Sequence, residues 1–70
     1  MHPLSQAIQG MTYTIKWMFG LPEALDKMYE FQLKEGSVIK VIHKYRDSLI
    51  IGTANKRIAI GYEVAERIQV

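Results

Sequence analysis

The segment from Phe31 to Val41 constrains the fold of this chain more than any other segment. A short helical pattern ends at Phe31, a turn is predicted at Gly36, and an apolar strand pattern begins at Val38. Two further apolar runs, at residues 49–51 and 57–60, follow within twenty residues. One helix that leads into several short strands, in so short a chain, indicates a small β-barrel. Such barrels usually bind other molecules rather than transform them.

The residues before this segment predict one strand followed by one helix. Residues 12–19 alternate between two sets of side chains, which is the period of a half-buried strand. Pro22 suits the first turn of a helix, where its missing N–H is not needed, and an apolar stripe extends the helix to about Phe31. Gln32 then stands where Gly or Asn would be the better left-handed cap.

The residues after the helix predict four more strands. The expected strands cover residues 38–45, 49–53, 56–60 and 68–70, with a single helical turn at 62–66. We therefore expect a mainly β fold: a small five-stranded SH3-like barrel with one helix inserted between the first and second strands. Closure into a barrel would hide most sheet edges. Residues 1–70 would form this single domain, because no linker or internal repeat divides them.

Composition excludes several classes of function. The chain has no cysteine, so disulfides, thiolate metal sites and thiol catalysis are excluded. The net charge is +2 with acids and bases interleaved, which is too weak for a nucleic-acid footprint. No apolar run approaches the roughly 18 residues of a membrane span, and the first ten residues do not form a signal peptide. We therefore expect a cytoplasmic protein without membrane insertion.

The order of several motifs resembles one known family. The motifs are Leu4-Ser5, Gly10, an alternating strand ending at Met18, a helix, Leu33-x-x-Gly36, Ile39-x-Val41, a hairpin, Arg57-Ile58-Ala59-Ile60-Gly61, Ala65 and Ile68-x-Val70. This pattern looks like the ferrous iron transport protein A (FeoA) family, and the resemblance covers nearly the whole chain. The family commonly has Leu-Gly-Leu-x-Pro-Gly at the helix exit, where this chain has Gln32 and Glu35 in place of the first Gly and the Pro.

The resemblance implies a function in iron homeostasis. A FeoA-like chain would be a small non-enzymatic adaptor that supports ferrous iron uptake by binding and regulating the cytoplasmic part of FeoB, the GTP-driven ferrous iron transporter. The same module forms the C-terminal SH3-like domain of iron- and manganese-dependent repressors. Those repressors carry an N-terminal winged helix-turn-helix, which this chain does not have, so DNA regulation is disfavoured.

The aromatic residues are the candidates for protein binding. SH3-like folds use aromatic clefts to grip peptides, and methionine adds an adaptable lining. The predicted contact residues are Trp17, Met18, Tyr29 and Tyr45, with Leu21, Leu25 and Met28 supporting the helix. The alternative is that Trp17 and Phe19 pack the helix onto the barrel.

Two other classes of function compete with the adaptor. A nucleic-acid-binding barrel would use the cations Lys40, Lys44, Arg46, Lys56 and Arg57, although only Tyr45 offers a stacking partner among them. A transition-metal-binding regulator would need imidazole and carboxylate ligands that converge. His2 and His43 are the only histidines, and no acid lies one or two residues from His43. We therefore assign no metal ligand, no cofactor and no catalytic residue, since no serine carries the signature of a nucleophile.

Overall fold

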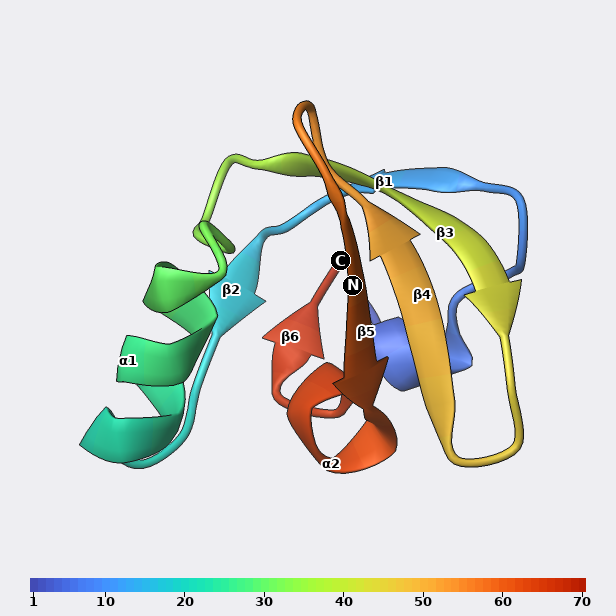
Figure 1. Cartoon of the computed structure of the whole chain (residues 1–70). Coiled ribbons are helices and arrows are strands. Elements are labelled where there is room, and N and C mark those ends of the chain that lie inside the picture. The colour runs from blue at the N-terminus through green and yellow to red at the C-terminus, as the bar shows by residue number, and fades with distance from the viewer.

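Two antiparallel sheets and one nine-residue helix make up the fold, which the computed structural model describes for all residues 1–70 (Figure 1). The elements in chain order are η1 (Leu4–Gln6), β1 (Thr12–Thr14), β2 (Trp17–Met18), α1 (Pro22–Glu30), β3 (Val38–Lys44), β4 (Ser48–Gly52), β5 (Arg57–Gly61), α2 (Tyr62–Ala65) and β6 (Ile68–Gln69). The larger sheet has the strand order β1-β3-β4-β5, and β2 pairs with β6 in the smaller one.

The mainly β character agrees with the sequence, but the predicted five-stranded closed barrel is not observed. Six strands form two separate sheets, because the first predicted strand divides into β1 and β2. The division occurs where the backbone changes partner. The Ile15 N–H donates to the Ser37 carbonyl oxygen over 2.8 Å, and the Lys16 N–H donates to the Gln69 carbonyl oxygen over 2.8 Å. Helix α1 consequently lies between the second and third strands.

The same change of partner alters which side chains point inward. Ile15 and Met18 are both buried, whereas Trp17 and Phe19 are exposed, so the strict alternation predicted for residues 12–19 is broken. Trp17 and Phe19 instead contact each other, with ring centroids 5.0 Å apart. Neither ring therefore belongs to the buried core.

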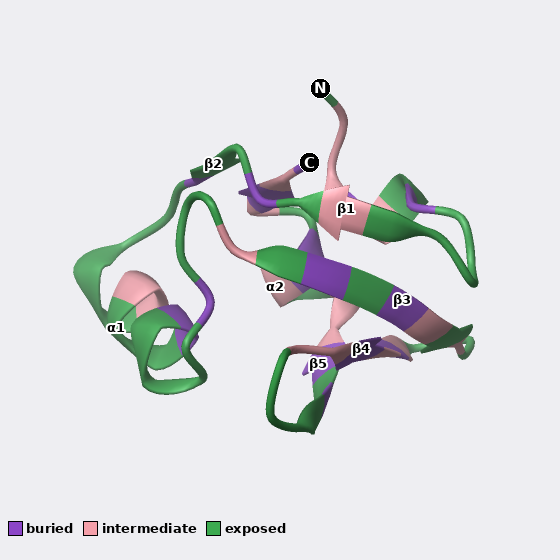
Figure 2. Ribbon diagram, turned by 90° about the horizontal axis from the view of Figure 1, so that it is seen from above, coloured by how far each residue is buried: buried purple, intermediate pink, exposed green.

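The core is entirely aliphatic apart from two methionines. Along β3, buried and exposed residues alternate, as Figure 2 shows, until a register shift between Val41 and His43 ends the alternation. No polar or charged residue is buried. The fully or nearly fully buried residues are Leu4, Ala7, Ile15, Met18, Met28, Leu33, Ile39, Val41, Leu49, Ile51, Ile58, Ile60, Ala65, Ile68 and Val70.

Helix α1 ends in a Schellman motif built on a non-glycine residue. Gln32 has a φ of 65° and is the only non-glycine residue with positive φ. The Gln32 N–H donates to the Tyr29 carbonyl oxygen and the Leu33 N–H donates to the Met28 carbonyl oxygen, each over 2.9 Å. Leu33 and Met28 are also both buried, which supplies the hydrophobic contact of this motif. The sequence marks this helix end only weakly, because Gly or Asn is the better left-handed cap, yet Gln32 adopts that conformation.

The two chain ends are paired with each other. The His2 N–H donates to the Val70 carbonyl oxygen over 3.0 Å, and the Val70 N–H donates to the His2 carbonyl oxygen over 2.9 Å. Pro3 forms a further isolated bridge with Gln69. The ends accordingly lie side by side in Figure 1. None of the helices has the length and apolar character that a membrane span requires.

Candidate functional site

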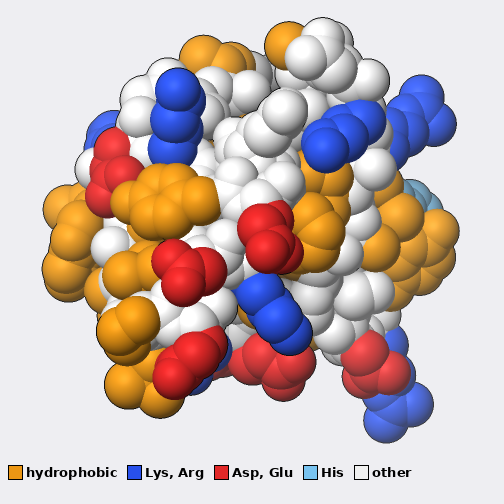
Figure 3. All heavy atoms as spheres, turned by 60° about the vertical axis from the view of Figure 1, so that its left-hand side comes forward, with side chains coloured by type: hydrophobic (Ala, Val, Ile, Leu, Met, Phe, Trp, Pro, Cys, Tyr) orange, Lys and Arg blue, Asp and Glu red, His pale blue; other side chains and the backbone are white.

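Large apolar side chains gather on the surface around α1. Six of the ten exposed large hydrophobic residues lie between positions 17 and 38. We define the α1 surface as the five of these that belong to β2, to α1 and to the residues that flank them. Figure 3 shows hydrophobic side chains gathered on this side of the molecule, with charged side chains between them. The α1 surface consists of Trp17, Phe19, Leu21, Tyr29 and Phe31.

An apolar groove of about 180 Å³ runs between α1 and the free edge of the larger sheet. The groove is possible because α1 buries only Met28 completely and leaves most of its length exposed. Phe31 belongs both to the groove and to the α1 surface, so the two form one continuous apolar feature. The groove is lined by Ala24, Lys27, Met28, Phe31, Ala59, Ile60, Gly61 and Val64.

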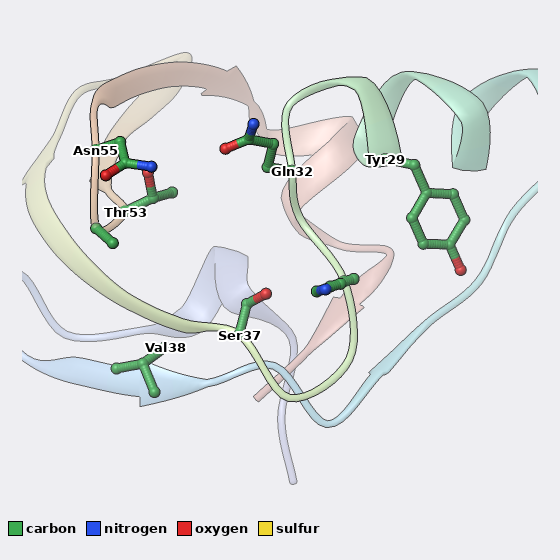
Figure 4. A pocket seen from close by; sticks show the side chains of 8 residues that line it. Tyr29, Gln32, Ser37, Val38, Thr53 and Asn55 are labelled. Carbon is green, nitrogen blue, oxygen red and sulfur yellow. The ribbon is translucent and has the colours of Figure 1, made fainter.

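A more polar pocket of about 570 Å³ lies between the exit of α1 and the β4–β5 hairpin. Its close view in Figure 4 shows Gln32 on one wall and the hairpin residues Thr53 and Asn55 on the other. The left-handed backbone at Gln32 determines where this amide lies. Tyr29 is at the edge of the pocket, and its ring points out from α1 in Figure 4. The pocket therefore offers neutral hydrogen-bonding groups and one cation, Lys34, beside the apolar α1 surface.

The structure separates the four predicted contact residues into three environments. Trp17 and Tyr29 are 52% and 50% exposed and lie on the α1 surface. Tyr45 is 53% exposed, but it follows β3 in the turn to β4, at the side of the molecule away from α1 (Figure 1). Its ring packs against His43, with centroids 4.4 Å apart.

The fourth predicted contact residue, Met18, lies in the core. Its side chain is only 4% exposed, because residue 18 of β2 points toward the core. It cannot touch a partner in this conformation. Of the three residues expected to support the helix, Met28 is buried and Leu25 is partly buried against the core. The Leu21 side chain is exposed, so this residue supports α1 only through its backbone, whose carbonyl oxygen accepts from the Leu25 N–H over 3.0 Å.

The histidines are engaged with aromatic rings rather than with acids. His2 packs edge-on against Tyr13 with ring centroids 5.5 Å apart, and His43 packs against Tyr45. No group of three or more His, Asp or Glu side chains is close enough to hold a metal ion. The polar hydrogen bonds that involve side chains serve the fold instead, as when the Lys44 ammonium donates to the Ser5 and Ala7 carbonyl oxygens.

Sequence reasoning missed Phe31 and the β5 edge as parts of the site. Phe31 continues the apolar stripe of α1, which favoured a buried position, yet it follows the last helical residue and is exposed. Ala59, with only a methyl group, and Gly61, with no side chain, line the groove, and these small residues are a signal that the sequence does contain. The sequence does not show the distance at which α1 packs against β5.

Comparison with known proteins identifies what this chain resembles. A sequence model of the FeoA domain matches residues 2–70. A search of curated proteins found no match. A solved structure described as an iron uptake regulatory protein (FeoA) is 28% identical, with a TM-score of 0.87 over 94% of this chain and 89% of that one.

Two more distant structures share the fold alone. Iron(II) transport protein A from Clostridium thermocellum is 20% identical, with a TM-score of 0.89 over 96% of this chain and 43% of that one. A manganese-dependent transcriptional repressor is 16% identical, with a TM-score of 0.87 over 96% of this chain and 39% of that one. The same fold is thus found both in a chain of similar length and within longer chains.

Proposed function

Because this chain belongs to the FeoA domain family, a non-catalytic family associated with ferrous iron transport, we propose that it is an adaptor for ferrous iron uptake. In this proposal the chain binds the cytoplasmic part of a FeoB-type, GTP-driven ferrous iron transporter and regulates it. The similar structure described as an iron uptake regulatory protein supports the proposal, since that similarity covers nearly all of both chains. The chain would act in the cytoplasm, where that part of the transporter lies.

The observation that carries the proposal is the apolar α1 surface and its adjoining groove. Monomeric proteins rarely leave several large apolar side chains together in water, and such patches mark interaction sites. Trp and Tyr are also the residues that most often contribute large shares of binding energy at protein interfaces. We propose that the transporter covers Trp17 and Tyr29, that Phe31 anchors the groove, and that Tyr45 lies outside the contact.

Binding itself is tested by biolayer interferometry, with the cytoplasmic region of the FeoB-type transporter from the same genome immobilised and the full chain in solution. We expect saturable binding that changes little between about 50 and 200 mM salt, whereas binding through phosphate contacts would weaken steeply in that range. The rate of GTP hydrolysis by the same region, with and without the chain, measures regulation. Absence of binding would refute the proposed function.

The surface is tested with three matched alanine variants. Trp17→Ala and Tyr29→Ala should each raise the Kd about tenfold or more, as expected for aromatic residues central to an interface. Tyr45→Ala is the control, because its ring is as exposed as the other two but lies away from α1. We expect less than about a twofold change for it. Equal effects of all three variants would contradict the assignment of the contact to the α1 surface, but would not contradict the proposal that the chain binds the transporter.

A further inference from the structure

The charges of this chain are segregated, although the net charge of +2 conceals it. None of the seven acidic residues belongs to a strand of the larger sheet. Three of them lie on α1, and the others lie in turns or on and beside α2. The strands of the larger sheet carry cations instead, and of its two hairpin turns only the β3–β4 turn holds an acid, Asp47. The acidic residues are Glu23, Asp26, Glu30, Glu35, Asp47, Glu63 and Glu66.

A hollow of about 400 Å³ lies among these cations on the outer face of β3, β4 and β5. Lys40 is directly opposite Gly52 in the pairing of β3 with β4, and Gly52 is directly opposite Arg57 in the pairing of β4 with β5. Two cations therefore flank a glycine across three strands. Adjacent strands are about 4.8 Å apart, so the Cα atoms of Lys40 and Arg57 are separated by about 10 Å. The Ile42 side chain covers Gly52, since its Cδ1 atom lies 2.9 Å from the position that a Cβ of Gly52 would take. An anion that both long side chains reach would therefore rest on Ile42, between the two cations.

The remaining lining residues fit the same kind of ligand. Lys56 adds a third cation, Asn55 and Thr53 add neutral polar groups, and Ile42 supplies the only large apolar surface. No carboxylate lines the hollow. Elsewhere in the chain, Lys44 and Arg67 donate to backbone carbonyl oxygens, whereas the three cations of the hollow make no side-chain hydrogen bond within the chain.

We propose that this basic hollow binds an acidic segment of a protein partner, with one carboxylate held between Lys40 and Arg57. Charge complementarity favours an anionic occupant, since paired cations at this spacing repel each other until an anion lies between them. The face has no Trp, Tyr or Phe on β3, β4 or β5, so it lacks the stacking groups that single-stranded nucleic acids use. The hollow is shallow, and Ile42 gives it one apolar contact for the aliphatic part of a partner's side chain.

This inference goes beyond the proposed transporter contact, because the hollow shares no residue with the α1 surface or its groove. Each of the two proposals can therefore be refuted without affecting the other. The alanine variants of Trp17 and Tyr29 test the α1 surface, and glutamine variants of Lys40 and Arg57 test the hollow.

The experiment titrates the isotope-labelled full chain with a short capped peptide of alternating Glu and Val residues and follows amide chemical shifts. We expect the largest shifts at Lys40, Gly52 and Arg57. The double variant Lys40→Gln/Arg57→Gln should weaken binding about tenfold or more, as expected for losing two charge-assisted contacts.

The matched control is Lys16→Gln/Arg46→Gln, which removes the same charge from exposed positions outside the hollow. It should change the Kd by less than about twofold, allowing only for long-range charge. A peptide with Gln in place of Glu should produce no shifts. Three results would overturn the proposal: equal binding of the Gln peptide, equal loss in both double variants, or tighter binding of an oligothymidylate or of anionic phosphatidylglycerol vesicles at the same residues.

Discussion

Gln32→Gly is expected to stabilise the domain, although it removes a side chain. The residue is held at a φ of 65° by the two hydrogen bonds of the Schellman motif and by the buried Leu33 and Met28. A left-handed backbone costs a non-glycine residue about 1–2 kcal/mol. Glycine avoids that cost but has more freedom in the unfolded chain, which offsets about 0.5–1 kcal/mol. The expected net gain in the free energy of unfolding is about 0.5–1 kcal/mol.

Urea denaturation followed by circular dichroism measures this gain, and a thermal melt should show a rise in Tm of about 2–8 °C. Two controls isolate the backbone. Gln32→Ala retains the strain and removes the side chain, which makes no hydrogen bond within the chain, so it should change little. Lys34→Gly adds glycine two residues on, where φ is not positive, and should cost about 0.5–1 kcal/mol. A Gln32→Gly variant no more stable than Gln32→Ala would refute the reasoning.

Three further predictions test the core, the turn before β3 and the junction with α2. Leu33→Ala removes a fully buried side chain and should cost about 2–5 kcal/mol by urea denaturation, whereas Leu33→Met should cost less than about 1.5 kcal/mol. Gly36→Ala should lower the free energy of unfolding by about 1–2 kcal/mol through its φ of 90° alone, since an added Cβ meets nothing within 4 Å; an unchanged value would contradict this. Tyr62→Phe removes the hydroxyl that donates to the Tyr45 carbonyl oxygen over 2.7 Å and should cost about 0.5–1.5 kcal/mol, with faster amide hydrogen exchange confined to the β3–β4 turn and α2.

Local patterns predicted the elements whose causes are local. Pro22 is the first residue of α1, as predicted, and the break predicted between residues 53 and 56 contains the hairpin turn that joins β4 to β5. Each of these depends on the φ preference or the hydrogen-bonding capacity of one or two residues. The sequence therefore contains enough information to place them.

The division of the first strand has no such local cause. It depends on Ile15 pairing with the loop before β3 while Lys16 pairs with Gln69, more than fifty residues away. An alternating pattern read from residues 12–19 alone cannot show where the partner changes. This change of partner also reverses which side chains point inward. Of the two predicted contact residues in β2, Trp17 is therefore exposed and Met18 belongs to the core. The apolar groove could not be predicted from the sequence for a related reason, because its existence depends on how far α1 lies from β5.

The pairing of His2 with Val70 has a consequence for how the domain resists force. The two ends are antiparallel neighbours joined by reciprocal hydrogen bonds, so a pull between them acts across the paired backbones rather than along them. Such a load breaks the bonds one after another instead of all together. A tether attached at both ends should therefore peel the chain open from this corner at low force, even in a variant whose thermal stability has been raised.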